Sequence, residues 1–354
     1  MNRRAFTTRA ALSVMAIPAI TNVRAKNILF NTATKVPIGL DAHAIRSTGW
    51  KAPALIDYTA ELGLNHLLMN HLGYYESLDE KYLKKLAKQA EKKGVSIDIG
   101  IGSLSKNSTS YNETNGNAKQ RIELGIKMAG IFGAKSVNCM IGNFRDRHTE
   151  GGIEARMEEI IGELKAMRTQ ISDAGLKFGI ENHAGDTRAE EVLTIIEEVG
   201  SDVCGAMVDP GNSVWTMENP MEHIQKLGKY AVCSSIRDYR IWESDKGATF
   251  QWTAIGDGIM DFPEYTRLMS ELCPGVPLYI ETINDLQLDI AFLTDDFWKG
   301  YPNIKGSDMK EFLSRIRQGE AIPLPEGGDK AEHQKQVLTK SIDYLKAKCP
   351  AVEG

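Results

Sequence analysis

The stretch KFGIENHAGD, residues 177–186, joins an apolar segment directly to a group of polar side chains. Residues 178–180 have the character of a buried strand, and Glu181, Asn182 and His183 follow without a break. A buried strand has no structural need for a carboxylate, an amide and an imidazole at its end, because each polar group loses its hydration there. Polar residues at the carboxyl end of a strand are typical of the (β/α)8 barrel, where they form the active site.

Similar apolar runs recur along the rest of the chain, with amphipathic segments of helical period between them. The eight runs are Val36–Ala42, His66–Met69, Ser96–Ile101, Ser136–Ile141, Lys177–Glu181, Gly205–Asp209, Val232–Ile236 and Pro277–Glu281. No linker rich in proline, glycine or serine separates them, so we predict a single (β/α)8 barrel of the α/β class. A doubly wound open sheet is the alternative, but no GxGxxG motif follows the first run.

The chain after the last run is longer than a barrel requires. We expect residues 285–325 to form a loop over the barrel mouth together with the last barrel helix. We expect the tail, residues 326–354, to be a C-terminal helical extension, with an additional surface helix over His333–Lys348.

The composition limits the classes of function. With 354 residues, of which 42% are hydrophobic, the chain is long enough to bury a large core. A net charge of -5 and the lack of a basic stripe argue against a nucleic-acid partner. The five cysteines show no CxxC spacing, which predicts buried free thiols rather than a metal finger.

The N-terminal residues resemble a twin-arginine export signal. Arg3 and Arg4 precede an apolar run at residues 10–20, which is too short to span a membrane, and residues 23–25 suit a signal peptidase. We therefore predict a signal peptide over residues 1–25, a barrel over residues 26–354, and a periplasmic protein without a membrane partner after export. A basic N-terminal helix of a cytosolic protein is the alternative.

Three carboxylates are expected at strand ends in the second half of the barrel. Glu181, Asp209 and Glu281 follow the fifth, sixth and eighth runs, and they would repel one another strongly unless a cation lay between them. Oxygen-rich sites favour Mn²⁺ or Mg²⁺, and an added imidazole would admit Co²⁺ or Zn²⁺. We predict one divalent metal ion; the alternative is that each carboxylate pairs with an arginine or lysine.

Five motifs in the second half of the chain are similar to those of the xylose-isomerase-like sugar isomerases and epimerases. They are GIENH at 179–183, VDPGN at 208–212, SIRD at 235–238, GDGIMDFPEY at 256–265 and YIET at 279–282. The first half of the chain is similar to that family only in the spacing of its predicted strands. The resemblance implies one divalent metal held from strands 5 to 8 and two glutamates that act as an acid/base pair. It assigns ligand and proton-transfer roles to Glu181 and Glu281, and a ligand role to Asp209.

The chain departs from the family pattern at two positions. Ser235 stands where the family has a histidine ligand on strand 7, and Asn212 stands where a second histidine is common. His183 lies two residues after Glu181, hence on the same side of a continuing strand, and is our candidate for a replacement ligand. A substrate contact or a hydrogen bond behind the site is the alternative for His183, and we expect Asn182 to face the neighbouring strand.

Six side chains near strand ends are candidates for substrate contacts: His43, His71, Asn212, Arg237, Asp238 and Trp298. Aromatic faces such as that of Trp298 stack on sugar rings, although a loop tryptophan also packs lids. For Arg237 and Asp238 a mutual salt bridge is the alternative.

The turn that follows the seventh predicted strand indicates which kind of substrate the protein binds. Gly256 and Gly258 could donate backbone hydrogen bonds to a phosphate, which barrels often bind there. Asp257 and Asp261 lie in the same turn and would repel a phosphate. We therefore expect a non-phosphorylated carbohydrate.

The sequence predicts a metal-dependent isomerase or epimerase acting on a non-phosphorylated carbohydrate or keto-sugar. Proton transfer by glutamates through a metal-stabilised enediolate would carry the reaction. Two alternatives are a lyase or hydratase that eliminates at the same site from a keto-glycoside or cyclitol, and a non-catalytic carbohydrate-binding barrel. A homo-oligomer is compatible with the sequence, which does not specify the state of assembly.

Overall fold

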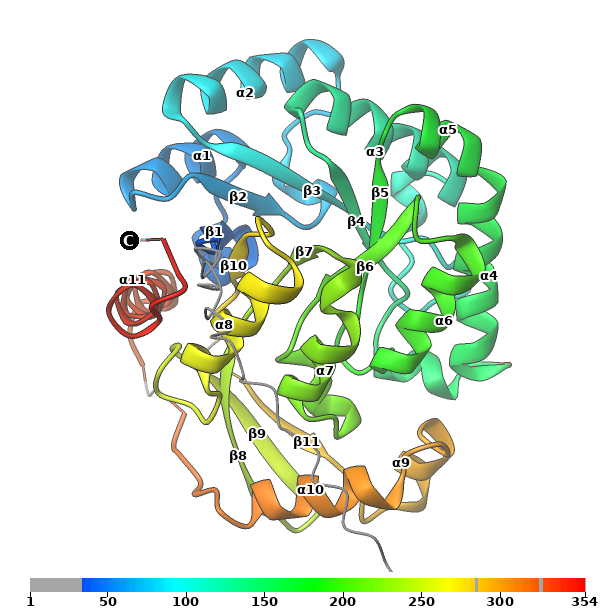
Figure 1. Ribbon diagram of the computed structural model, residues 1–354, viewed down its shortest axis with the longest axis vertical. Helices are drawn as coiled ribbons and strands as arrows, with labels where there is room; N and C mark the ends of the chain where they lie inside the picture. Colours follow the sequence, from blue (N-terminus) through cyan, green and yellow to red (C-terminus); the bar gives the residue numbers. More distant parts are fainter. Residues whose placement is uncertain (1–33, 284–285, 325–326, 354) are drawn as a thin grey trace, which may run out of the picture. The chain divides into compact units, whose positions relative to one another are not determined.

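Eight parallel strands form a ring in the computed structural model, which describes residues 34–283, 286–324 and 327–353 (Figure 1). The strands are β1 (Ile38–Asp41), β2 (His66–Met69), β3 (Ser96–Ser103), β4 (Ser136–Met140), β5 (Lys177–Glu181), β6 (Cys204–Val208), β7 (Ala231–Ser234) and β10 (Leu278–Ile280). Their order is β10-β1-β2-β3-β4-β5-β6-β7. A parallel bridge between Ile236 and Ile280 closes the ring, and the Glu281 N–H donates to the Ile236 carbonyl at 2.8 Å.

Each strand lies at one of the eight predicted runs, with bounds that differ by one or two residues at most. The predicted (β/α)8 barrel is therefore confirmed, and the alternative of an open sheet is wrong. The predicted export signal, residues 1–25, lies outside the described residues. In the described ranges, no helix is both long and apolar enough to cross a membrane.

Helices cover the outside of the ring between successive strands (Figure 1). They are α1 (Ala52–Glu61), α2 (Glu80–Lys93), α3 (Ala118–Phe132), α4 (Gly152–Ala166), α5 (Arg168–Asp173), α6 (Ala189–Val199), α7 (Pro220–Leu227) and α8 (Phe262–Leu272). Short 3-10 helices are η1 (Ala42–Thr48), η2 (Leu72–Tyr74), η3 (Glu113–Asn115), η4 (Phe144–His148), η5 (Asn212–Thr216) and η6 (Gly228–Tyr230). Because η1, η2, η4 and η5 follow strands β1, β2, β4 and β6, they lie at the carboxyl end of the barrel.

The barrel is filled on both sides of its wall, which explains why its strands are continuous apolar runs. Leu68, Met207, Cys233 and Tyr279 form a buried cluster of their own, drawn from four different strands. The Tyr279 hydroxyl donates to the carboxylate of Asp98 on β3, so this aromatic ring is anchored across the barrel.

The C-terminal helix completes the barrel. α11 (Lys330–Lys348) lies beside β10 and η1 (Figure 1) and contributes Leu338 and Leu345 to the main core. The Ser341 hydroxyl, also on this face, accepts a hydrogen bond from the Ile255 N–H at 3.0 Å. The helix expected in the tail is present, but it is more than an added surface helix, since it is the outer helix of the eighth strand.

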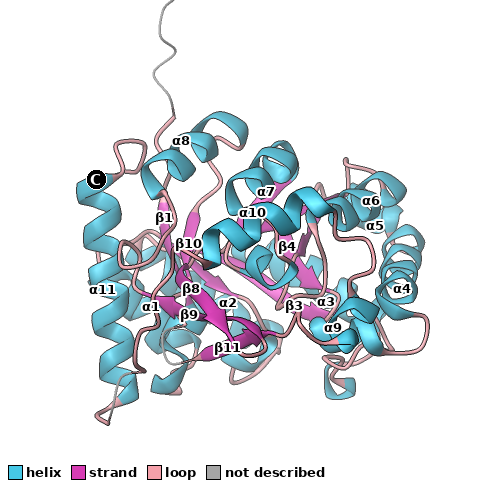
Figure 2. Cartoon of the chain, turned by 90° about the horizontal axis from the view of Figure 1, so that it is seen from below, coloured by secondary structure: helices cyan, strands magenta, loops and turns pink. Residues whose placement is uncertain are grey.

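The segment after β10 was expected to be a loop plus the last barrel helix, and that expectation is wrong. It adds β11 (Gln287–Ile290), α9 (Asp295–Gly300) and α10 (Gly306–Ile316) to a hairpin of β8 (Asp238–Ser244) and β9 (Gly247–Thr253). The three strands form an antiparallel sheet in the order β11-β9-β8, with α10 beside it (Figure 2). Phe250, Phe292 and Phe312 belong to its separate hydrophobic cluster. The module follows β7 and β10, so it stands next to the barrel mouth.

A substitution in α11 tests its place in the barrel. Leu338→Ala removes a fully buried side chain from the main core and should lower the free energy of unfolding by about 2–5 kcal/mol. Thr339→Ala, at the adjacent exposed position, should change it by less than about 0.5 kcal/mol. Chemical denaturation at 25 °C measures both, and equal small effects would mean that α11 is peripheral.

Candidate active site

Three carboxylates meet at the carboxyl end of the barrel, as the sequence predicts. Glu181 is the last residue of β5, Asp209 follows β6 directly, and Glu281 follows β10. One carboxylate oxygen from each lies within 4.8 Å of the other two, and all three side chains are buried. The closed barrel brings the ends of β5, β6 and β10 to one mouth, which is why residues 100 positions apart become neighbours.

An amide holds two of these strand ends together. The Asn182 side chain donates to the Asp209 carbonyl at 2.7 Å and accepts from the Asp209 N–H at 3.0 Å. This pair of bonds extends the β5–β6 ladder beyond its last paired residues, so the backbone of Asp209 is fixed relative to β5. Asn182 therefore faces the neighbouring strand, in the structural role expected from the sequence.

Arg237 provides a cation inside the carboxylate group. Its guanidinium binds both Asp209 and Glu281, and lies 5.0 Å from the ring centroid of Trp252. The salt bridge that the sequence offered between Arg237 and Asp238 is not formed. For Asp209 and Glu281, the pairing with a basic residue that stood as the alternative to a metal is thus present in the structure.

The two positions that depart from the family pattern hold the carboxylates by hydrogen bonds. The Ser235 hydroxyl donates to Glu281 at 2.7 Å, and the Asn212 amide donates to Asp209 at 2.8 Å and to Glu181 at 3.3 Å. Both side chains are buried. Ser235 and Asn212 therefore act as hydrogen-bond donors that hold the carboxylates in position.

A fourth carboxylate, to which the sequence assigned no metal or catalytic role, belongs to the site. Asp41, the last residue of β1, is fully buried and accepts from Asn70 at 3.3 Å and from the Ser235 hydroxyl at 3.5 Å. Its position at the end of the first run was the available signal. The predicted barrel implies that the first strand pairs with the last, and the pairing of β1 with β10 brings Asp41 next to Glu281.

The charges at this site are unbalanced. Burial, followed by the charge of Glu281, raises the pKa of Asp41 and of Glu181 well above the ordinary range. Burial and Glu281 also raise the pKa of Asp209, although Arg237 opposes them. Burial acts on Glu281 too, but Arg237, His43 and Ser235 outweigh it, and the net effect lowers its pKa. One guanidinium therefore keeps Glu281 ionised, while its neighbours favour their protonated forms.

The donor set fits a hard divalent cation. Oxygens at about 2.0–2.6 Å from a common ion lie within about 5 Å of one another, a condition that the three clustered carboxylates meet. Four buried carboxylates against one guanidinium also leave an excess of negative charge that an ion of charge +2 would offset. The ion would share Asp209 and Glu281 with Arg237, which is feasible because each carboxylate has two oxygens.

His183, the proposed replacement ligand, lies beside this group and not within it. Its Nδ1 is 2.5 Å from the Gly142 carbonyl, and its backbone N–H donates to Asp186 at 2.7 Å. A backbone carbonyl on one ring nitrogen directs the other nitrogen, Nε2, away from it, as for many metal-binding histidines. The described carboxylate triad does not include His183, so its ligand role stays a prediction.

His43 and His71, the two histidines expected to contact substrate, line one cavity of about 200 Å³ between η1 and η2. Burial is the largest influence on His43 and lowers its pKa to about 4, so this imidazole is neutral near pH 7. The charge of Glu281 opposes that shift, which shows that His43 lies within electrostatic reach of the carboxylates. Tyr74 lines the same cavity and was not singled out by the sequence.

Two further candidates for substrate contacts have other partners. Both oxygens of Asp238 accept backbone N–H groups, from Tyr239 and Met260 on one and from Gly256 and Gly258 on the other. Burial raises the pKa of Asp238 to about 6.

Trp298 packs in the hydrophobic cluster of the small sheet, and its indole N–H donates to the Phe292 carbonyl at 2.7 Å. The oxygens of Asp238 and the indole N–H of Trp298 are thus used inside the protein, and the contacts of both residues with substrate, including stacking on the ring of Trp298, stay predictions.

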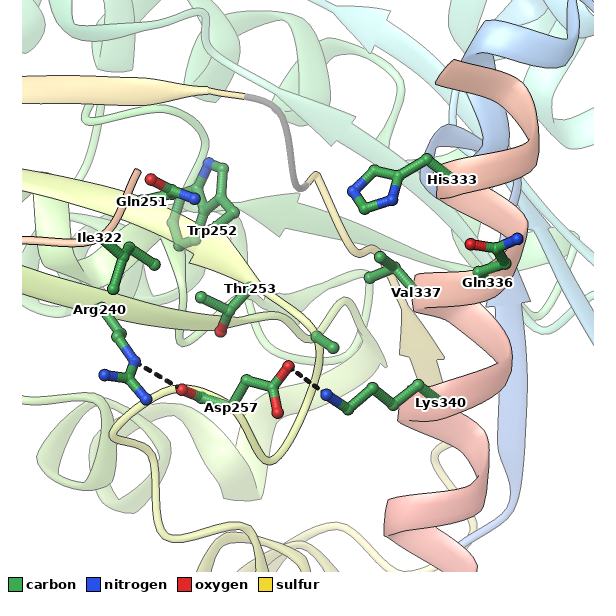
Figure 3. Close-up of a pocket in the computed structure, with 11 residues that line it drawn as sticks. Arg240, Gln251, Trp252, Thr253, Asp257, Ile322, His333, Gln336, Val337 and Lys340 are labelled. Atoms are coloured by element: carbon green, nitrogen blue, oxygen red, sulfur yellow. Dashed lines mark hydrogen bonds and ion pairs between the residues drawn. The ribbon is translucent and has the colours of Figure 1, made fainter. Parts of the chain in front are cut away.

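A separate cavity of about 500 Å³ lies between the β8–β9 hairpin and α11 (Figure 3). Arg240 and Thr253 line it from the hairpin, and His333 and Lys340 line it from the helix. Lys340 donates to the Asp257 carboxylate at 2.6 Å, and Arg240 donates to the Asp257 carbonyl at 2.8 Å. None of the clustered carboxylates lines this cavity, so the chemistry is centred elsewhere.

The chain is similar to several known proteins. The chain is 21% identical over 211 residues to the 3-oxo-isoapionate decarboxylase of Pectobacterium atrosepticum, which covers 59% of this chain and 69% of that protein. D-psicose 3-epimerase, solved in the presence of D-fructose, matches with a TM-score of 0.56 at 16% identity, over 84% of this chain and 93% of that one. The IolI protein with a zinc atom matches with a TM-score of 0.52 at 13% identity, over 79% and 99%.

At these identities the solved structures show a shared fold alone. The family itself is shown by a sequence model described as Xylose isomerase-like TIM barrel, which matches residues 55–296. That range contains β2 to β10 and the strand ends that carry Glu181, Asp209 and Glu281. The resemblance seen in the five motifs is confirmed, and the chain belongs to the xylose isomerase-like TIM barrel family.

Proposed function

We propose that this protein is an isomerase or epimerase of a non-phosphorylated carbohydrate, in which Glu181 and Glu281 transfer protons beside a divalent cation. The observation that carries the proposal is the convergence of Glu181, Asp209 and Glu281 at the barrel mouth within 4.8 Å. The epimerase structure similar to this chain supports the reaction class. The proposed periplasmic location rests on the twin arginines of the sequence alone.

The surroundings of the two glutamates suit them to opposite roles in proton transfer. Arg237 keeps Glu281 ionised, so this carboxylate can accept a proton from the carbon next to the substrate carbonyl. Burial and the charge of Glu281 raise the pKa of Glu181, which favours its protonated form when no cation is bound. Glu181 is therefore our candidate for the group that returns a proton to the other face of that carbon or to its neighbour. Two carboxyl groups whose pKa values are driven apart by their surroundings form an acid/base pair.

The remaining residues orient this pair. Asp209 would hold the cation together with the two glutamates, and when bound the ion supplies Lewis-acid stabilisation of negative charge on the substrate oxygens. Asn212 and Ser235 fix the carboxylates by hydrogen bonds, which reduces the reorganisation needed when charge moves. Burial of the whole group limits access of water.

The turn between β9 and α8 supports a substrate without phosphate. The backbone N–H groups of Gly256 and Gly258, which could have bound a phosphate, both donate to Asp238 at 3.0 Å. The carboxylate of Asp238 thus occupies the anion position with a group of the chain itself.

A second candidate function is a lyase or decarboxylase that uses the same proton-transfer site on a keto-sugar derivative. Two observations favour it: the decarboxylase similar to this chain, and the guanidinium of Arg237 inside the site, where it can pair with a substrate carboxylate. Deuterium incorporation from solvent into a panel of keto-sugars and glycosides separates the two. An isomerase or epimerase exchanges the carbon-bound proton with solvent deuterium, and the substrate loses no fragment. A lyase or decarboxylase releases water, an alcohol or carbon dioxide.

Replacing either glutamate by glutamine should remove turnover and leave the fold intact. Glu181→Gln and Glu281→Gln each delete a proton-transfer group, so kcat should fall by about 10²–10⁴-fold or more. Glu158→Gln, at an exposed position on α4, is the matched control and should retain activity. Steady-state kinetics and thermal unfolding are the measurements, and wild-type turnover in either site variant would disprove the two-glutamate mechanism.

Metal content tests the cation site directly. Elemental analysis of the purified protein should find one divalent ion per chain, and Asp209→Asn should lose it while Asp257→Asn, on the surface, retains it. Chelation should abolish proton exchange, and addition of Mn²⁺ should restore it. A protein with no stoichiometric ion, whose sugar binding survives chelation unchanged, would instead be the non-catalytic binding barrel.

The pH dependence should respond to Arg237. Because its guanidinium lowers the pKa of Glu281, Arg237→Gln should raise that pKa, so the base is protonated at higher pH. The acid limb of the kcat/KM profile should therefore move to higher pH. Arg317→Gln, at an exposed site, serves as the control, and an unmoved acid limb in Arg237→Gln would exclude Glu281 as the base.

A further inference from the structure

We infer that Tyr301, which directly follows α9, is a positioning residue for His183 and holds it in place through the backbone turn at residues 183–186. The turn begins directly after Asn182, whose side chain is bonded to the backbone of Asp209, so it continues from the carboxylate site itself. This role rests on the proposed function, since it names a residue outside the site on which the proposed reaction would depend.

The turn contains a strained backbone position. Ala184 has a φ of 43°, and it is one of two residues other than glycine with a positive φ in the described ranges. In this left-handed region the Cβ of an L-residue crowds the carbonyl that follows, so alanine is disfavoured there relative to glycine. Such positions persist only where the surrounding structure holds them. The turn therefore needs contacts that keep Ala184 in this conformation.

Two other segments of the chain hold the turn by hydrogen bonds. The Tyr301 hydroxyl donates to the Gly185 carbonyl at 2.8 Å. From η4, the Arg147 Nε donates to the same carbonyl at 3.1 Å, and the Phe144 N–H donates to the Ala184 carbonyl at 2.8 Å. The carbonyls on both sides of the strained position are thus bonded, one segment of support following β4 and the other following β10.

Tyr301 is itself firmly packed. It is 4% exposed, the Arg147 guanidinium lies 4.4 Å from the centroid of its ring, and the ring of Phe297 stacks on it with centroids 4.6 Å apart. Its hydroxyl approaches the turn so closely that a Cβ at Gly185 would lie 2.9 Å from the hydroxyl oxygen. Tyr301 therefore acts as a fixed support against which the turn rests.

The turn fixes both the backbone and the side chain of His183. The His183 N–H donates to the Asp186 carboxylate at 2.7 Å, and Nδ1 lies 2.5 Å from the Gly142 carbonyl. A carbonyl can only accept, so Nδ1 carries a proton and donates it. Nε2 has no hydrogen bond to any of the described residues, and the side chain is half-buried. An imidazole with one nitrogen fixed and the other available, two residues beyond Glu181, is suited to contact a cation or a substrate.

A second arrangement of the same three groups provides a matched control. The Tyr111 hydroxyl donates to the Gly116 carbonyl at 3.2 Å, the Arg121 Nε donates to that carbonyl at 3.0 Å, and the Arg121 guanidinium lies 4.0 Å from the centroid of the Tyr111 ring. This arrangement lies between β3 and α3 and at the start of α3, where no candidate site residue is found. Tyr301→Phe and Tyr111→Phe therefore remove the same kind of hydrogen bond, at the turn and away from it.

Amide hydrogen exchange and turnover of the full chain test the inference. Tyr301→Phe removes one hydrogen bond from the turn, so the His183 and Asp186 amides should exchange about five- to tenfold faster. Deuterium incorporation into D-fructose from deuterium oxide should slow by about 10–100-fold, because small misplacements of reacting groups lower rates steeply. Tyr111→Phe should change neither rate. Thermal unfolding of both variants checks that the fold is retained.

Ala184→Gly supplies a test that a merely structural role of Tyr301 would not pass. Glycine adopts a positive φ without the steric conflict, so the turn should keep its conformation with less support. In the Ala184→Gly background, Tyr301→Phe should therefore change the amide exchange and the deuterium incorporation by about threefold or less. A loss caused only by weaker packing around Tyr301 would be the same in both backgrounds.

Three results would overturn the inference. These are equal effects of Tyr301→Phe and Tyr111→Phe, unchanged amide exchange in Tyr301→Phe, or a deficit of the same size in the Ala184→Gly background. The proposed function is judged separately, by proton exchange in Glu181→Gln. Loss of exchange in that variant, together with unchanged rates in Tyr301→Phe, would retain the function and reject the inference. Absence of exchange with D-fructose in the unmodified chain would count against the function alone, and the amide rates would still decide the inference.

Discussion

The burial of four carboxylates around one guanidinium is the constraint on which the rest of the site depends. Asp41, Glu181, Asp209 and Glu281 have little contact with water, and Arg237 can neutralise only one of their charges. Such a group is stable only if protons or a further cation supply the difference. The same excess of buried negative charge makes the pKa values of the two glutamates differ. The burial of the charges therefore produces the difference that an acid/base pair requires.

Much of the fold could be predicted from the sequence because it depends on local patterns. Each of the eight strands is an apolar run of a few residues, and a buried parallel strand needs no alternation of polar residues. The final helix could not be placed in this way. The amphipathic face of α11 could pack on any apolar surface. Only the packing of Leu338 and Ser341 against the barrel shows that α11 is one of the helices of the barrel and not a helix added to its surface.

The site was predictable only in part, and for a related reason. Strand position identified Glu181, Asp209 and Glu281, because the carboxyl ends of parallel strands meet at one end of a barrel. The partner of Arg237 could not be read from its neighbour Asp238, since adjacent residues of an extended chain point in opposite directions.

The first and last parts of the barrel are joined to each other. Val36, just before β1, forms a parallel bridge with Val352, just after α11, and accepts a hydrogen bond from the Glu353 N–H at 3.0 Å. At roughly 5–20 residues per second, a ribosome needs on the order of 16–60 s to make the chain between these two valines. For most of that time β10 has not been made, and α11 is made later still, so the edge of β1 that pairs with β10 has no partner from the same molecule. The ring therefore cannot close, and Glu281 cannot join the other carboxylates, until the last strand of the barrel has been synthesised.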